Sequence, residues 1–372
     1  MPRELVAVAP RTPVLREYDD PPLGPREVRV QTEFASPKHG TELVGYRDEP
    51  AAHRPYDRDL GCVVPRTPEQ AAGSFPRALG NMAVGTVVEV GAEVSRFRTG
   101  DRVFGHFPIR ETQTVSEDAT DSMPEGLSPQ AAVCLDPAVM ALALRDARIR
   151  LGDRVAVFGL GTIGLMAVQL ARLAGAEQVV GLDLIPARRE VARELGADVV
   201  LDPLAGAGDA GLALRQLLGG AGRAMELSAP RRVLGGYWET PTQLGQMGVD
   251  VAVEASGSVQ ALHQAVRATR FGGTVCVISF YGGDAAGLWL GEEFHMNRLQ
   301  LVSARAESLP LRDAPGWNLE RLVRLAVSWL ASGRLSAEGI VTPVVAFEDA
   351  AEAYREIDEH PDRSIKLGVR FG

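Results

Sequence analysis

The chain has 372 residues, of which 45% are hydrophobic and 23% are charged, and its formal net charge is −9. This length favours two domains, and an acidic balance without any cluster of Lys or Arg argues against a nucleic-acid partner. No apolar run approaches the roughly 18 residues of a membrane span, and the three cysteines, Cys62, Cys134 and Cys276, lack the paired spacing of a disulfide framework or of a zinc lobe built from four cysteines.

The first part of the chain, to about residue 135, is predicted to be rich in β-strands. Residues 27–32 and 83–91 alternate apolar and polar side chains, as half-buried strands do. Glycines and prolines separate these runs at short intervals. This pattern is typical of a barrel-like β domain.

The middle of the chain, from Asp153 to about Arg305, alternates strand and helix patterns. Compact apolar strands are expected near residues 154–158, 178–183, 198–201, 249–255 and 274–279, with helices over 164–174 and 186–195. Strands that are apolar throughout, separated by helices, indicate a parallel sheet covered on both faces. A helix from about Leu319, a strand at 341–345, a helix at 348–357 and a strand at 365–371 are interpreted as a return to the first domain.

A glycine-rich turn follows the first of these middle strands and opens a helix. It reads Gly159-Leu160-Gly161-Thr162-Ile163-Gly164. In such a turn the first glycine permits the tight bend, the second lets a pyrophosphate approach the backbone, and the third lets the helix pack closely on the strand. The amide N–H groups and the positive dipole end of the helix then favour phosphates.

Asp183 ends the next strand, where a carboxylate can bind the adenosine ribose diol. A carboxylate at that place repels a 2′-phosphate, so NAD is expected rather than NADP. Arg188 and Arg189 leave this question open, because an arginine nearby could bind such a phosphate. We expect Arg188 to contact the cofactor and NAD to be the cofactor.

Five segments together resemble the medium-chain dehydrogenase/reductase superfamily, which includes zinc alcohol and polyol dehydrogenases and quinone reductases. They are residues 23–30, 84–91, 97–103, 253–257 and 271–275. The resemblance implies an α/β protein in which residues 1–138 and 306–372 form a GroES-like, β-rich catalytic domain. It further implies that residues 139–305 form a Rossmann domain, a doubly wound parallel sheet, with the active site in the cleft between the two domains.

The positions that hold catalytic zinc in the family are altered in this chain. His39 stands in place of the family's cysteine, Asn81-Met82 in place of its His-Glu pair, and Asp136 in place of a glutamate. His39 and Asp136 could supply two ligands, and His106 a third only if the geometry allowed it, whereas zinc takes about four. The chain resembles a divergent member without the usual zinc ligands, and we expect no catalytic metal.

Catalysis without zinc would depend on proton transfer, because no cation would be present to stabilise a developing alkoxide. The resemblance implies that Thr41 touches the substrate oxygen and starts a proton relay. His39 is the best general base by its ordinary pKa, or else a helix-start residue bonded to backbone. Glu42 and Asp136 are further catalytic candidates. The alternative for Glu42 is a first-turn residue favoured by the helix dipole, and the alternative for Asp136 is a cap of the helix that follows it.

The predicted function is the interconversion of a secondary alcohol and a ketone, on a polyol, a cyclitol or a natural-product carbinol, with NAD(H). The alternatives are a zinc-free enoyl or quinone reductase of the same fold and a redox-silent NAD-binding protein. We expect a cytoplasmic protein, because residues 1–13 lack the apolar core of a signal peptide. The expected partners are a small-molecule substrate and other copies of the chain, in a homodimer or homotetramer paired along an apolar sheet edge at 275–280. The long insertion at 205–246 is expected to cover the cleft, to face a partner subunit or to decorate the surface.

Overall fold

The structure is a computed structural model that describes residues 1–64, 75–205, 208–219 and 247–372. The chain divides into two compact units, one made of Met1–Asp136 with Val323–Gly372 and the other of Pro137–Leu322. The expected class, α/β with a β-rich part and a parallel sheet, is confirmed. Within the described residues, no helix combines the length and the apolar character needed to cross a bilayer.

The first unit is built on a seven-stranded mixed sheet in the order β10-β8-β7-β3-β18-β17, with β9 also paired to β3, and on a smaller sheet, β2-β1-β6. Its elements are β1 (Arg3–Ala9), β2 (Thr12–Glu17), β3 (Glu27–Ser36), α1 (His39–Tyr46), β4 (Tyr56–Asp57), β5 (Cys62–Val63), β6 (Arg77–Ala78), β7 (Met82–Val90), β8 (Arg102–Gly105), β9 (Thr112–Ser116), β10 (Asp121–Ser122), α3 (Pro129–Ala132), β17 (Val341–Ala346), α10 (Ala350–Glu359) and β18 (Lys366–Arg370).

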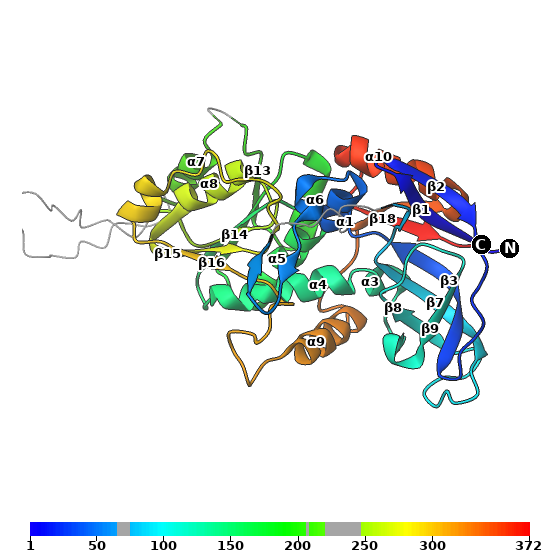
Figure 1. Ribbon diagram of the computed structural model, residues 1–372. Coiled ribbons are helices and arrows are strands. Elements are labelled where there is room, and N and C mark those ends of the chain that lie inside the picture. Colours follow the sequence, from blue (N-terminus) through cyan, green and yellow to red (C-terminus); the bar gives the residue numbers. More distant parts are fainter. Residues whose placement is uncertain (65–74, 206–207, 220–246) are drawn as a thin grey trace, which may run out of the picture. The chain divides into compact units, whose positions relative to one another are not determined.

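Strand β3 is central to this unit because its alternating side chains enter the core. Val28 and Val30 are buried on one face and pack with Val87 of β7 and Val103 of β8. At its other end β3 pairs antiparallel with β18, so the last strand of the chain lies beside a strand from its beginning (Figure 1). The segment that follows β3 is thereby held against Lys366 and Leu367.

The second unit is a six-stranded, wholly parallel sheet in the order β13-β12-β11-β14-β15-β16 (Figure 1). This is the Rossmann order, in which the chain reverses direction across the sheet beside the first strand. Its elements are α4 (Leu135–Leu142), β11 (Arg154–Phe158), α5 (Thr162–Leu173), β12 (Gln178–Leu182), α6 (Pro186–Glu194), β13 (Val199–Leu201), α7 (Ala210–Gly219), β14 (Val249–Glu254), α8 (Val259–Ala268), β15 (Thr269–Val277), β16 (Gln300–Ser303) and α9 (Leu319–Ala331), of which α4 begins and α9 ends in the first unit.

The strands of the second unit are apolar on both faces, as the sequence predicted. Val155, Ala156 and Val157 of β11 are all fully buried, because α5 and α8 pack against this strand. The stretch 275–280, expected at the sheet edge, lies partly in β15, which pairs with β14 on one side and β16 on the other. The edge strand at this end of the sheet is therefore β16, and β13 forms the other edge. Most of the 205–246 insertion falls outside the described residues.

Candidate active site

The glycine turn after β11 has the geometry that a dinucleotide site requires. Gly159 has a φ of +89° and Gly161 lies directly before α5 without a side-chain cap. The first intrahelical hydrogen bond runs from the N–H of Leu165 to the carbonyl of Gly161 at 2.9 Å. The first turn of α5, with Thr162, Ile163 and Gly164, therefore presents the positive end of the helix at the carboxyl edge of the sheet.

The three glycines of the turn meet different surroundings. A Cβ on Gly164 would lie 1.8 Å from the carbonyl oxygen of Gly159, and one on Gly159 would lie 2.7 Å from Ser256. These two positions need glycine for the fold itself. A Cβ on Gly161 would meet nothing within 4 Å, so the backbone there is open to a ligand. The turn thus fits a bound pyrophosphate.

Asp183 lies directly after β12 and is fixed beside the turn. Its Oδ2 accepts the N–H of Leu160 at 2.7 Å and its Oδ1 accepts the N–H of Ile185 at 2.9 Å. The side chain is 8% exposed, and Nη1 of Arg188 lies 3.8 Å from Oδ2. The structure therefore brings all the predicted cofactor residues together at one edge of the sheet.

Glu254 is a buried carboxylate at the same edge that sequence reasoning missed. It ends β14, is fully buried, and accepts hydrogen bonds from the N–H and hydroxyl of Ser256 and from the hydroxyls of Ser279 and Tyr281. Burial and the Glu254 charge raise the pKa of Tyr281 above its ordinary value. This carboxylate ties together the loops that follow β14 and β15, next to the glycine turn.

The catalytic candidates on α1 lie together in the first unit. His39 is the first residue of the helix, and its Nε2 accepts the N–H of Leu367 at 2.9 Å. Thr41 is exposed. Glu42 accepts the N–H of Lys38 at 3.0 Å, the N–H of Gly80 at 2.7 Å and the hydroxyl of Tyr354 at 2.7 Å. Burial raises the pKa of Glu42 in spite of these donors.

Asp136 joins this group, although the sequence placed it nearly 100 residues away. It lies in the first turn of α4 and not before it, so it is not the cap of that helix. Its side chain is 5% exposed and is paired with the ammonium of Lys38, whose Nζ lies 2.9 Å from Oδ2 and donates a hydrogen bond to Oδ1 at 3.2 Å. Lys38 thus places a positive charge beside this carboxylate, which the sequence did not predict.

A second ammonium, that of Lys366, completes the group. Its side chain is almost wholly buried and Nζ donates to the carbonyl of Pro37 at 2.8 Å, and this burial lowers its pKa. Of the 39 basic residues in the chain, Lys38 and Lys366 alone are lysines. One of these two lysines directly precedes His39 and the other is the first residue of β18, and this is the signal that sequence reasoning overlooked.

The residues of this site do not fit a zinc ion, because they offer donors where a metal needs lone pairs. Lys38 carries a positive charge, and the lone pair of His39 Nε2 is engaged by the N–H of Leu367. The buried amide nitrogen of Asn81, another donor, has no hydrogen-bond partner. Met82 is buried in the core as the first residue of β7. In the part of the chain that is described, no three His, Cys, Asp or Glu side chains are grouped to hold a metal.

Two family profiles match the chain. The one described as zinc-binding dehydrogenase matches residues 162–309, and the one described as alcohol dehydrogenase GroES-like domain matches residues 58–134. D-guloside 3-dehydrogenase of Escherichia coli (strain K12) is 37% identical over 377 residues, covering 99% of this chain and 100% of the relative. (R,R)-butanediol dehydrogenase of Bacillus subtilis (strain 168) is 25% identical, covering 91% of this chain and 90% of the relative.

Solved structures with the same fold cover the whole chain. The 2R,3R-butanediol dehydrogenase of Bacillus subtilis has a TM-score of 0.73 at 22% identity, covering 100% of this chain and 99% of that one. A Sinorhizobium meliloti 1021 protein bound to NADP has a TM-score of 0.70 at 21% identity, with coverages of 100% and 99%. A short chain alcohol dehydrogenase of E. coli CFT073 complexed with NADH has a TM-score of 0.71 at 18% identity, again with coverages of 100% and 99%. At these identities the likeness concerns the fold.

Proposed function

This chain belongs to the medium-chain dehydrogenase/reductase superfamily, in its zinc-type alcohol dehydrogenase-like branch, and on that premise we propose that it is an NAD(H)-dependent oxidoreductase that interconverts a secondary alcohol and a ketone. Residues 1–138 and 306–372 would supply the catalytic groups, and residues 139–305 the cofactor site. The observation that carries the proposal is the pairing of an open Gly161 backbone with the fixed carboxylate of Asp183 at one edge of a parallel sheet.

The substrate class is proposed from a relative that covers 99% of the chain. That relative is named for dehydrogenation at position 3 of a D-guloside, which is a secondary alcohol on a sugar ring. We extend the polyol and carbinol expectation accordingly to the ring hydroxyl of a glycoside. The retained Thr41, on the exposed side of α1, supports a role in contacting such a hydroxyl.

The cofactor is proposed to be NAD(H), for an electrostatic reason. A 2′-phosphate beside the buried carboxylate of Asp183 would be repelled, and Arg188, 3.8 Å from that carboxylate, already has a negative partner. When bound, the dinucleotide takes up the hydrogen and the electron pair of the carbinol C–H bond. The chain's own residues then have to bind the substrate oxygen and remove its proton.

The proton route is proposed to begin at Thr41, and His39 is proposed to hold the start of α1 in place. A neutral imidazole that accepts a hydrogen bond at Nε2 carries its proton on Nδ1. The bond from the N–H of Leu367 therefore fixes the ring orientation of His39 and places its proton on Nδ1. The contacts of Glu42 favour an anchoring role for that carboxylate.

The test is NADH formation from NAD+ and methyl D-guloside, followed by absorbance, together with fluorescence titrations of both reduced cofactors. We expect NADH to bind more tightly than NADPH. Asp183→Ala should weaken NADH binding about tenfold or more, because charge-assisted hydrogen bonds to the ribose are lost. Asp183→Asn keeps the size of the side chain and one acceptor oxygen. Its affinity for NADH should therefore lie between those of the unaltered enzyme and of Asp183→Ala. Tighter NADPH binding that Asp183→Ala leaves unchanged would overturn the cofactor assignment.

A further inference from the structure

We propose that the ammonium of Lys38, held by Asp136, is the cation that binds the substrate oxygen and stabilises the negative charge that develops on it. The proposal rests on the function proposed above and adds a catalytic residue to it. Zinc-type relatives use a metal for this purpose. Here Lys38 is the chain neighbour of His39, and its ammonium lies 2.9 Å from Asp136, so it is linked to the positions that correspond to two of the family's ligands.

The ion pair has the burial that such a role requires. The side chain of Asp136 is 5% exposed, so its charge is poorly screened by water and holds the ammonium in place. The side chain of Lys38 is 24% exposed. An ammonium carries three donor hydrogens, and one is directed to Asp136 Oδ1. The others can reach an oxygen without breaking the pair.

Lys366 does not compete for this role. Its side chain is essentially buried, and its Nζ donates to the carbonyl of Pro37 at 2.8 Å. That bond holds the backbone just before Lys38. Lys366 is therefore a positioning residue, whereas Lys38 is the lysine with an accessible face.

The surroundings of Lys38 also favour an oxygen ligand over a metal. The buried amide nitrogen of Asn81 lacks an acceptor, and its backbone N–H bonds to Ser36, two residues before Lys38. An ammonium and an amide N–H₂ on adjoining segments suit an alkoxide or a carbonyl oxygen. They repel a cation, because both carry positive charge on their hydrogens.

The reaction balances without a metal. In the oxidising direction the carbinol C–H bond breaks, and its electron pair leaves with the hydrogen to an oxidised nicotinamide dinucleotide. The O–H bond breaks as well, and its proton passes to the hydroxyl of Thr41, whose own proton leaves to water. Lys38 stays an ammonium throughout and donates a hydrogen bond to the oxygen while the C=O bond forms. Removing one such donor typically lowers kcat by about 10²–10³.

The first experiment compares Lys38→Met and Lys38→Arg with the unaltered enzyme, using NAD+ and methyl D-guloside. Lys38→Met should lower kcat about 10²–10³-fold, while NADH binding by fluorescence and the circular dichroism spectrum stay unchanged. Lys38→Arg, which keeps the charge and the partner Asp136, should recover activity to within about tenfold. As a matched control, Arg102→Met removes another paired cation of the same unit, which lies 2.7 Å from Glu33, and should leave kcat unchanged. Full activity of folded Lys38→Met would overturn the proposal.

The second experiment has a readout that does not depend on turnover. Elemental analysis of the purified enzyme, and cobalt(II) titration followed by its absorption bands, should show well below one metal ion per chain, and chelators should leave activity intact. About one zinc per chain, lost to chelator together with activity, would overturn the assignment of Lys38 and restore His39 and Asp136 as candidate ligands.

An enzyme that binds NADH and lacks metal but does not oxidise methyl D-guloside would count against the proposed substrate alone. Lysine labelled with ¹³C would then decide the case of Lys38, since its signal should shift when a ketose or glycoside from a wider panel binds, and an unmoved signal on binding would contradict the proposal.

Discussion

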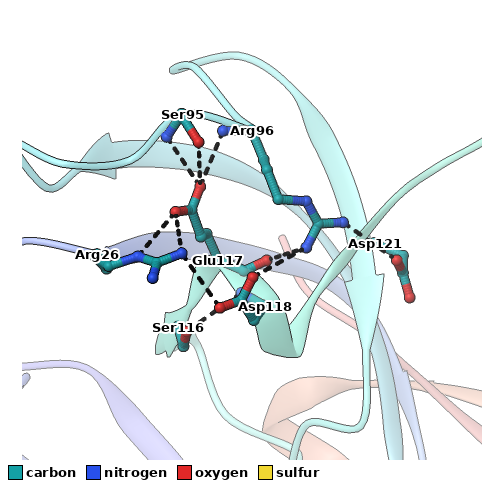
Figure 2. Close-up of polar contacts among 7 residues, drawn as sticks. All are labelled: Arg26, Ser95, Arg96, Ser116, Glu117, Asp118 and Asp121. Carbon is teal, nitrogen blue, oxygen red and sulfur yellow. Dashed lines mark hydrogen bonds and ion pairs between the residues drawn. The ribbon is translucent and has the colours of Figure 1, made fainter.

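At the scale of single residues, the first unit contains a buried carboxylate whose charge is fully compensated. Glu117 is 1% exposed, and its Oε2 accepts the N–H groups of Ser95 and Arg96, each at 2.9 Å, while its Oε1 accepts from Arg26 at 3.1 Å (Figure 2). The two backbone donors and the Arg26 guanidinium lower the pKa of Glu117 to about 2. The residue thereby joins three loops of the β-rich unit.

This low pKa predicts a pH-dependent contribution to stability. The folded-state value lies below the ordinary value of 4.5, so the charged group stabilises the fold above about pH 4.5 and loses that effect as pH falls toward 2. Glu117→Gln should lower Tm by a few degrees at pH 7 and by less at pH 3, because pH 3 lies between the two pKa values, where the carboxyl of the unfolded chain is already mostly protonated and part of the contribution is lost. Thermal unfolding at the two pH values tests this, and an equal drop at both would contradict it. The exposed Glu348→Gln serves as the control.

At the scale of elements, two glycines at the junction of β11 and α5 have different roles. Gly164 is needed for the packing of the helix, whereas Gly161 is needed for the binding of the cofactor. Gly164→Ala would place a methyl group 1.8 Å from the carbonyl oxygen of Gly159. We expect a loss of about 1–3 kcal/mol of stability together with weaker NADH binding, since α5 must shift. Gly161→Ala meets no neighbour and should keep its Tm. It should still weaken NADH binding, because the methyl group points toward the pyrophosphate position.

Calorimetry and cofactor titration on both variants measure these effects. If Gly161→Ala lost stability as Gly164→Ala does, the open surface assigned to this turn would be wrong. If Gly161→Ala bound NADH as tightly as the unaltered enzyme, the pyrophosphate would have to lie elsewhere.

The elements themselves were largely predictable from sequence, because their signals are local. The strands of the Rossmann sheet were found from their apolar runs, and the helix predicted over 186–195 is α6, Pro186–Glu194. The helix predicted from Glu348 begins instead at Ala350, because residues 347–349 form a tighter turn first. Periodicity does not distinguish such a turn from the helix that follows it.

The chemistry of the candidate site was less predictable, because it depends on contacts between distant parts of the chain. Lys38 and Asp136 are 98 residues apart, and Lys366 reaches Pro37 across 329 residues. The motif shows which family ligands are missing, because Asn81 and Met82 stand at their positions. It does not show that the positive charge of Lys38 is placed beside Asp136 in the fold. That information appears only once β18 is placed beside β3.

At the scale of the whole molecule, the exposed edge of the parallel sheet predicts self-association. Among the described strands, β16 pairs with β15 alone, and its Leu301 is 41% exposed. Large exposed apolar side chains occur in the preceding segment, at Phe280, Trp289 and Met296. An unpaired edge with apolar neighbours is normally covered, and symmetric pairing of two copies would cover it.

We therefore expect a homodimer, or a tetramer built from it. Light scattering at micromolar concentration should give at least twice the chain mass of 39.8 kDa. Leu301→Lys, which places a charge on the edge strand, should shift the protein toward monomer without changing NADH binding to a single chain. A clean species at the chain mass in the unaltered protein would refute the prediction.

The scarcity of lysine has a practical consequence for work on this enzyme. Because Lys366 is buried, Lys38 and the amino terminus are the amines that reagents can reach in the folded chain. Amine coupling to sensor surfaces, biotin esters and aldehyde fixation would therefore attach either at the amino terminus or at the proposed substrate site, so loss of binding after immobilisation could reflect attachment at Lys38. In the folded chain endoproteinase Lys-C can reach the bond after Lys38 but not the one after the buried Lys366, so its rate of cleavage after Lys38 would report how often the site opens.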